Sequence, residues 1–286
     1  MKLSVGAFSF NNSRIEQKMD SYGYMKTVHE EYGLDTIDFW NAFFADTSRP
    51  LWAVANDDTL LGIKAALQER GLTLANIAVD TAQLWHPDEE VREALHQNAL
   101  SYLHAAELLG ARSVRLDAVT HGDEQMSDEA CDYIVKRYTE YARRAAEGGY
   151  WIGPENHTGF ALQADSLIRI AQAVDHPNFG ILLHVGRWVD TIPTPSNKRL
   201  NPEAIHALAR EHDLSVLPWT KHIHIDARTI YSDDAAARIK PLLDAGYDGY
   251  WAIEHNAPQD QREAISAALQ QMRLHLEQCA GSDARN

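Results

Sequence analysis

The sequence has little cysteine and no long apolar run. Only Cys131 and Cys279 are present, far apart and without a Cys-x-x-Cys pair, so we expect no disulfide framework and a reducing compartment. No stretch reaches the ~18 apolar residues of a membrane-spanning helix. The opening apolar stretch MKLSVGAFSF is too short for a signal peptide. A cytoplasmic protein without a membrane partner is therefore the default expectation.

Positive charge is also scarce. The 286 residues carry 26 Lys and Arg against 41 Asp and Glu, a formal net charge of −15. Because phosphate backbones are bound by basic surfaces, this balance argues against nucleic acid as a partner. No G-x-G-x-x-G follows the first apolar run, which weakens a dinucleotide-binding interpretation.

The chain does contain a regular alternation of short apolar runs and amphipathic stretches. The runs predict strands at 3–10, 36–40, 73–81, 113–119, 151–156, 179–185, 222–225 and 250–254. The stretches between and after them predict helices at 13–32, 57–71, 87–110, 127–149, 163–174, 201–211, 232–246 and 258–278. Eight such units without a composition break predict an α/β fold, a single (β/α)₈ TIM barrel over residues 1–279. We expect residues 280–286 to form a disordered tail.

Four of the later predicted strands end in side chains that bind metals. Glu155, His184, His224 and Glu254 close apolar runs in PENH, LLHVGRW, HIHID and AIEHN. One such residue is more often simply hydrogen-bonded, because a polar group in an apolar run must be paired, solvated or ligating. In this fold, however, the C-terminal strand ends meet at one mouth. Two carboxylates and two imidazoles there predict a divalent-metal site.

Strand periodicity separates the polar residues of HIHID. His222, His224 and Asp226 share one face, which we expect to line the barrel interior, while the isoleucines between them face the helices. His224 lies nearer the mouth and is the better ligand, whereas His222 is one layer deeper and supports the site. We also expect His222 and Asp226 among the residues that contact the substrate. His157 and His255 follow the two glutamates, and either is a candidate base or an ordinary mouth residue.

Aromatic residues gather near the predicted mouth at Phe8, Phe10, Trp40, Trp85 and Trp188. Each of them has core packing as its alternative explanation. Together they favour contact with a sugar ring or an aryl glycoside over a small phosphorylated substrate.

These motifs, with GLDTIDFW and LGARSVRLDA, resemble the xylose-isomerase-like barrels, which include sugar isomerases, epimerases, inosose dehydratase and endonuclease IV-type nucleases. The resemblance implies that Glu155, His224 and Glu254 bind metal. The family's sixth strand usually carries Asp-x-x-His, whereas this chain has His184-Val-Gly-Arg187. His184 then replaces a carboxylate, and Arg187 offers a fixed charge to a substrate oxyanion. A degraded metal site is the alternative.

An imidazole-rich shell favours Mn²⁺, with Fe²⁺, Co²⁺, Zn²⁺ or Mg²⁺ as alternatives. The expected function is a metal-dependent isomerase or epimerase of a keto-sugar that acts through an enediolate, with Glu155 and Glu254 exchanging the proton. The alternatives are β-elimination from a 3-oxo-glycoside, as in C-glycoside deglycosidases with His157 as base, and an inosose-dehydratase-like reaction. A nuclease, a hydrolase and a non-catalytic sugar-binding barrel stay open. The resemblance also implies a homo-oligomer, with a small accessory subunit if the protein is deglycosidase-like.

Overall fold

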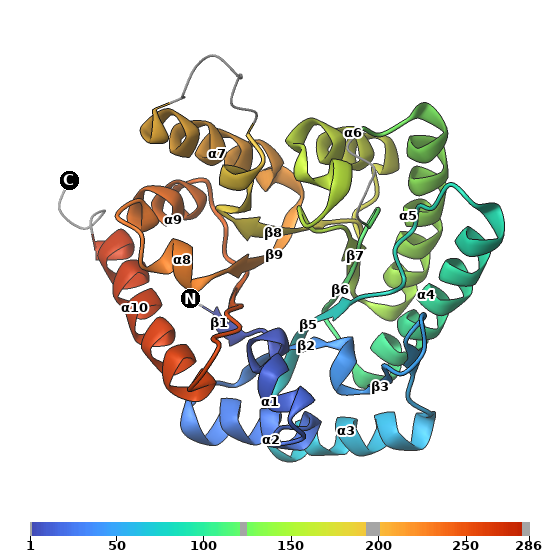
Figure 1. Cartoon of the computed structure of the whole chain (residues 1–286), viewed down its shortest axis with the longest axis horizontal. Helices are drawn as coiled ribbons and strands as arrows, with labels where there is room; N and C mark the ends of the chain where they lie inside the picture. The colour runs from blue at the N-terminus through green and yellow to red at the C-terminus, as the bar shows by residue number, and fades with distance from the viewer. Residues whose placement is uncertain (1, 121–124, 193–200, 282–286) are drawn as a thin grey trace.

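A computed structural model describes residues 2–120, 125–192 and 201–281 and contains eight parallel strands that form a barrel with helices around it (Figure 1). The barrel is built from two four-stranded arcs, in the orders β1-β10-β9-β8 and β2-β5-β6-β7. The predicted fold is confirmed. The barrel strands are β1 (Lys2–Val5), β2 (Thr36–Trp40), β5 (Thr73–Val79), β6 (Ser113–Leu116), β7 (Trp151–Gly153), β8 (Ile181–Val185), β9 (Thr220–Ile225) and β10 (Tyr250–Ile253).

Isolated backbone bridges close the barrel where the two arcs meet. Gly6 pairs with Asp38 at one seam, and Ile152 with Phe179 and Glu155 with Leu182 at the other. Each seam therefore includes an acidic residue, Asp38 at the first and Glu155 at the second.

The helices begin and end where the sequence places caps. Asp88, Ser127 and Asn201 accept hydrogen bonds from the first amides of α4, α5 and α7. Gly110 and Gly149 follow α4 and α5 in the left-handed conformation. The helices are α1 (Asn11–Ile15), α2 (Ser21–Lys26), α3 (Asp57–Glu69), α4 (Glu89–Leu109), α5 (Asp128–Gly148), α6 (Ala164–Val174), α7 (Pro202–Val216), α8 (Ala227–Ile230), α9 (Ala235–Asp244) and α10 (Gln261–Gly281).

The first predicted helix, 13–32, is wrong as a single element. α1 ends at a turn in which Gln17 has φ 58°, and Asp20 then starts α2 by accepting a hydrogen bond from Gly23. Local side-chain capping thus interrupts the apolar periodicity. A π-helical segment, η2 (Thr27–Glu31), follows α2.

Other boundaries differ less from prediction. The short hairpin of β3 (Ala45–Asp46) and β4 (Ala53–Val54) was not predicted, and α7 ends at Val216 instead of near 211. Of the predicted tail, residues 282–286 lie outside the described part of the chain, whereas α10 extends to Gly281. Across residues 2–120, 125–192 and 201–281, no helix combines the length and the apolar character needed to cross a bilayer.

Candidate metal centre

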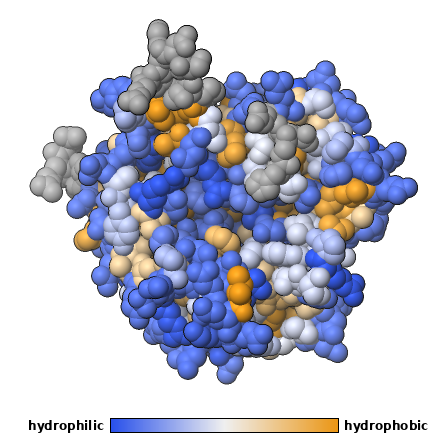
Figure 2. All heavy atoms as spheres, viewed as in Figure 1, coloured by the Kyte–Doolittle hydropathy of each residue, from blue (hydrophilic) through white to orange (hydrophobic). Residues whose placement is uncertain are grey.

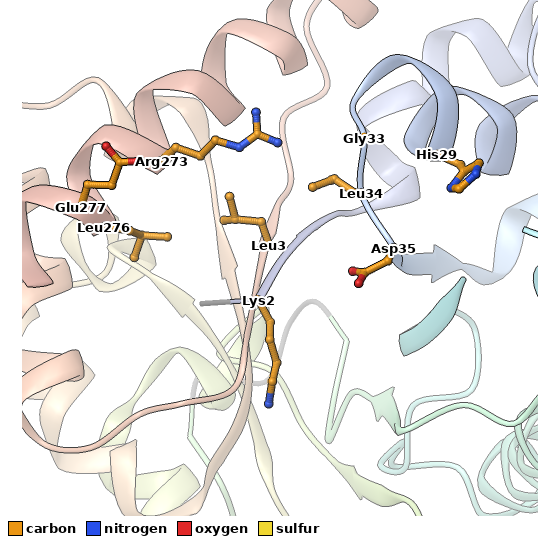
Figure 3. A pocket seen from close by; sticks show the side chains of 9 residues that line it. All are labelled: Lys2, Leu3, His29, Gly33, Leu34, Asp35, Arg273, Leu276 and Glu277. Atoms are coloured by element: carbon orange, nitrogen blue, oxygen red, sulfur yellow. The ribbon is translucent and has the colours of Figure 1, made fainter. Parts of the chain in front are cut away.

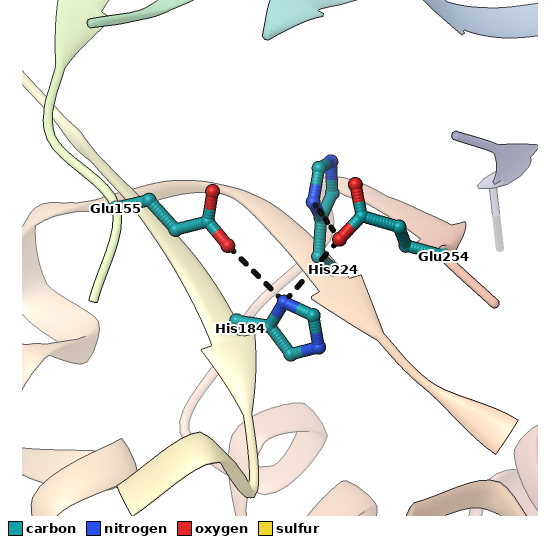
Figure 4. Close-up of side chains that lie close together, drawn as sticks. All are labelled: Glu155, His184, His224 and Glu254. Carbon is teal, nitrogen blue, oxygen red and sulfur yellow. Dashed lines mark hydrogen bonds and ion pairs between the residues drawn. The ribbon is translucent and has the colours of Figure 1, made fainter. Parts of the chain in front are cut away.

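The four predicted ligands come together at one point of the mouth (Figure 4). Glu155, His184, His224 and Glu254, called here the metal cluster, each offer a ligand atom within 4.8 Å of the others. His184 Nδ1 lies 3.1 Å from Glu155 Oε1 and 3.7 Å from Glu254 Oε2, and His224 Nδ1 lies 3.6 Å from the same Glu254 oxygen. Four residues from successive strands β7 to β10 therefore point two oxygens and two nitrogens at a shared space.

Asp38 orients the metal cluster from below, and the sequence analysis gave it no role. This buried carboxylate accepts hydrogen bonds from His224 Nε2 at 2.9 Å and from His222 Nε2 at 2.5 Å. Since Nε2 of His224 is engaged, Nδ1 is the nitrogen that faces Glu254. A carboxylate behind the imidazole of a metal-binding histidine fixes the ring and its tautomer. The motif IDFW could have indicated this role, because Asp38 is the one charged residue of a buried strand.

The residues present fit a divalent ion. His224 Nδ1 is buried and has no hydrogen-bond partner in the described structure, although it points at a carboxylate. Ligand atoms about 2.0–2.2 Å from an ion lie roughly 3–4 Å from each other, and the distances from His184 to Glu155 and Glu254 and from His224 to Glu254, 3.1–3.7 Å, lie in this range. Mixed imidazole and carboxylate ligands suit Mn²⁺, Fe²⁺, Co²⁺ or Zn²⁺.

The charges of the metal cluster are strongly coupled. Burial would raise the pKa of Glu254, but the neighbouring His224 lowers that pKa to about 2. Burial likewise disfavours a charge on His224, yet Asp38 and Glu254 raise the pKa of His224 well above 6.5. For His184, burial and then the charge of Arg187 lower the pKa. A proton on His224 thus supplies positive charge between the carboxylates when no ion does.

A second ionic group, called here the arginine network, lies beside the metal cluster on the early strands. The buried Arg115 places Nη1 2.9 Å from Asp80 Oδ1 and 2.9 Å from Asp117 Oδ2, and its Nε 3.2 Å from Glu155 Oε2. Burial favours the neutral form of Glu155, but His157, the hydrogen bond with His184 and the charge of Arg115 hold its pKa well below the usual range. The sequence analysis missed Arg115 and the two aspartates.

His157 connects to the arginine network through Asp117. Its Nδ1 lies 2.9 Å from Asp117 Oδ2, and about a third of its side chain is exposed. Burial lowers the pKa of His157, but Asp117 and Glu155 outweigh this effect and raise it. Since Nδ1 is engaged, Nε2 is left to face a substrate. His255, the other candidate base, is held through its backbone N–H, which donates to Ser9 Oγ at 2.9 Å.

Arg187 lies at the edge of the metal cluster. Its Nη1 is 3.8 Å from Glu155 Oε1, and the side chain is a quarter exposed. Gly186 turns the chain here with φ 83°, and a Cβ at this glycine would approach Thr229 Oγ1 to 2.7 Å. The left-handed turn therefore requires glycine, and it aims Arg187 toward the mouth.

Three of the predicted aromatic residues stand at or beyond the ends of early strands: Phe8 after β1, Trp40 at the end of β2 and Trp85 after β5. Phe8 packs edge-on against Trp40 with ring centroids 5.2 Å apart, and the Trp40 indole donates a hydrogen bond to Asp80 Oδ2 at 2.7 Å. Trp85 lies under the guanidinium of Arg92, 4.7 Å from its ring centre. Trp40 and Trp85 are mostly buried, and their contact with a substrate stays a prediction.

The placement of the other predicted residues does not support substrate contact. Trp188 and Phe10 have no exposed surface, because the indole packs against His212 and the phenyl ring against Tyr24. His222 is buried below His224. Asp226 starts α8 by accepting a hydrogen bond from the Thr229 N–H at 2.8 Å, so its carboxylate serves as a helix cap.

The hollow drawn in Figure 3 lies away from this chemistry. It has a volume of about 600 Å³ and is lined by residues that include Lys2, Asp35 and Arg273. Lys2 starts β1 and Asp35 precedes β2, which places the hollow at the N-terminal ends of the strands. On the face seen in Figure 2 the surface is mainly hydrophilic, with separate hydrophobic patches.

Comparison with known proteins agrees with this fold. The family model described as "Xylose isomerase-like TIM barrel" matches residues 28–275. The chain belongs to this family. No curated protein matches it.

Solved structures with the same fold are distant in sequence. The 3-keto-D-glucoside 4-epimerase from E. coli is 17% identical with a TM-score of 0.66, covering 96% of this chain and 99% of that one. A probable 3-DHS dehydratase from Bacillus anthracis is 14% identical with a TM-score of 0.67, with the same coverage. A xylose isomerase-like barrel protein from Mycobacterium smegmatis in complex with magnesium is 21% identical with a TM-score of 0.65, covering 96% and 97%. At these identities the likeness establishes the fold alone.

Proposed function

We propose that this protein is a divalent-metal-dependent isomerase or epimerase of a keto-sugar. The observation that carries the proposal is the metal cluster, in which two carboxylates and two imidazoles converge while Asp38 holds His224 Nδ1 toward them. A divalent ion held by Glu155, His184, His224 and Glu254 would polarise a carbonyl–hydroxyl pair and stabilise the enediolate left when a proton is removed. Mn²⁺ is the ion we propose.

The chain's own residues divide the proton transfer. The side chain of Glu254 is 14% exposed and that of Glu155 only 2%, so we propose Glu254 as the first proton acceptor. In an epimerisation Glu155, on the opposite side of the metal cluster, takes up a proton from solvent and delivers it to the other face, and Glu254 releases the substrate proton to solvent before the next turnover. Return to the neighbouring carbon by the same side gives an isomerisation. Arg187 offers its charge to an oxygen of the sugar, and the aromatic rings of Phe8, Trp40 and Trp85 pack against the sugar.

A second candidate function is β-elimination from a 3-oxo-glycoside. The pair His157–Asp117 favours it, because it adds a third acid–base group beside the two glutamates. The 3-keto-glucoside epimerase and the dehydratase among the related folds are consistent with both reactions. In this reaction His157 removes the proton, and the aglycone leaves from the β-carbon.

Deuterium exchange tests the proposal and separates the two reactions. A panel of keto-sugars and 3-oxo-glycosides is incubated with the Mn²⁺-loaded protein in D₂O, with Glu254→Gln as the matched variant. Deuterium should enter the carbon next to the carbonyl in the wild type and not in the variant. Absence of deuterium from every turned-over sugar would overturn the proton-transfer mechanism. Release of an aglycone without epimerisation would select elimination.

A further inference from the structure

The arginine network contains a second set of metal-ligand side chains. Asp117, Glu155 and His157 offer ligand atoms within 4.8 Å of one another, as the metal cluster does, and the two sets share Glu155. Asp80 adds a third carboxylate, 2.9 Å from Arg115. Asp117 and Glu155 are buried, whereas about a third of Asp80 and of His157 is exposed, and buried carboxylates need a cation beside them.

Arg115 supplies that cation from within the chain. Its guanidinium contacts Asp80, Asp117 and Glu155 at 2.9–3.2 Å and donates to Val79 O at 3.1 Å, with 4% of the side chain exposed. A guanidinium keeps its charge at every pH a protein tolerates. Arg115 faces three carboxylates, and Asp117 Oδ1 is buried without a hydrogen-bond partner. The network therefore retains unused capacity for positive charge.

The two oxygens of Glu155 are divided between the two groups. Oε1 lies 3.1 Å from His184 in the metal cluster, whereas Oε2 lies 3.2 Å from Arg115. A carboxylate that bridges two ions uses one oxygen for each, and here the second oxygen already has its cation. The charge of Arg115 also repels an ion that approaches Asp117.

We propose that Arg115 occupies the position of a second divalent cation and thereby keeps the metal centre mononuclear. This inference rests on the proposed metal centre. Removal of the guanidinium should open a second ion site made by Asp80, Asp117, His157 and Glu155 Oε2. Glu155 would then bridge two ions.

The test is the number of Mn²⁺ ions per chain, measured by elemental analysis after gel filtration and by electron paramagnetic resonance. The wild type should bind one ion, and Arg115→Ala should bind two with a spin-coupled signal. Arg115→Lys keeps the charge and should bind one. Arg115→Ala combined with Asp117→Asn removes a ligand of the second site and should return to one.

Two results would overturn the inference alone: a folded Arg115→Ala protein that binds one ion, or a wild type that binds two coupled ions when Mn²⁺ is in excess. A wild type that binds none would overturn the proposed metal centre, and this inference with it. Loss of a buried partner destabilises a fold, so thermal unfolding gives a second measurement. Mn²⁺ should raise the Tm of Arg115→Ala more than that of the wild type, because two ions bind instead of one; an equal or smaller rise would contradict the inference.

Discussion

The two halves of the barrel mouth treat buried charge differently. On the later strands, β7 to β10, the metal cluster brings carboxylates and imidazoles together and leaves His224 Nδ1 without a hydrogen-bond partner. On the early strands, the arginine network matches its carboxylates with a guanidinium from the same chain. Of these two groups, then, the early-strand one carries its own cation, whereas we propose that the later-strand one binds a divalent ion.

We infer that the metal cluster binds an ion, whereas the arginine network holds neighbouring side chains in position. We propose that an ion entering the metal cluster displaces a proton from His224. The Arg115 guanidinium cannot give up its charge, and it contacts Glu155 directly and His157 through Asp117.

Loss of both glutamates should abolish the later-strand centre. The double variant Glu155→Gln, Glu254→Gln leaves two imidazoles and removes both negative charges, so we expect the metal content to fall from about one ion per chain to none, and metal-dependent turnover to disappear. Elemental analysis measures the metal, and Glu69→Gln, an exposed glutamate on α3, is the control. Full metal content in the double variant would show that the ion binds elsewhere.

His157→Gln tests the boundary between the two halves. For β-elimination, in which His157 is the proposed base, we expect kcat to fall by about 10²–10⁴-fold, the usual contribution of a general acid or base, while the metal content stays the same. Steady-state kinetics and elemental analysis of the same sample measure both. The exposed His29→Gln variant serves as the control. Unchanged kcat would reduce His157 to a mouth residue without a catalytic role.

Asp38→Asn should weaken metal binding without removing a ligand. The variant loses the carboxylate that fixes His224, and such outer partners typically contribute about 10–100-fold in affinity. Titration of the apo-protein in competition with a chelator measures the change, and Asp35→Asn, an exposed aspartate just before β2, is the matched control. Equal affinities for the two variants would contradict the orienting role of Asp38.

Metal affinity should rise with pH. The pKa of His224 is raised above its unfolded value of 6.5, so protonated His224 stabilises the metal-free fold fully below about pH 6.5, and this stabilisation is lost as pH rises through the folded pKa. An incoming ion must displace that proton, so its affinity should rise by at most about tenfold per pH unit wherever the pH lies below the folded pKa of His224, and level off above it. Both glutamates, with pKa values lowered by their neighbours, stay ionised over this range. Calorimetric titrations between pH 6 and 9 measure the trend, and a flat profile would show that no proton is displaced.

The metal cluster could be predicted because each of its residues is recognisable from its own place in the sequence. Glu155, His184, His224 and Glu254 stand at or just beyond the ends of apolar strands, and parallel strands of one barrel end at one face. The early half could not be predicted in this way. Asp38 and Arg115 lie inside buried strands, where the sequence shows only an interruption of an apolar run and not its partner.

By itself, the sequence determined the eight-fold alternation, the caps of the long helices and the four side chains of the metal cluster, because strand period, capping chemistry and strand order are short-range properties. Only the tertiary structure decided that Asp38 lies behind His224 and that Arg115 joins Asp80, Asp117 and Glu155. It also decided that Trp188 packs inward while Trp40 faces the arginine network. These pairings join residues of different strands, some across the barrel and some side by side. Closure of the sheet decides which of these side chains meet. The spacing of residues along the chain does not contain that information.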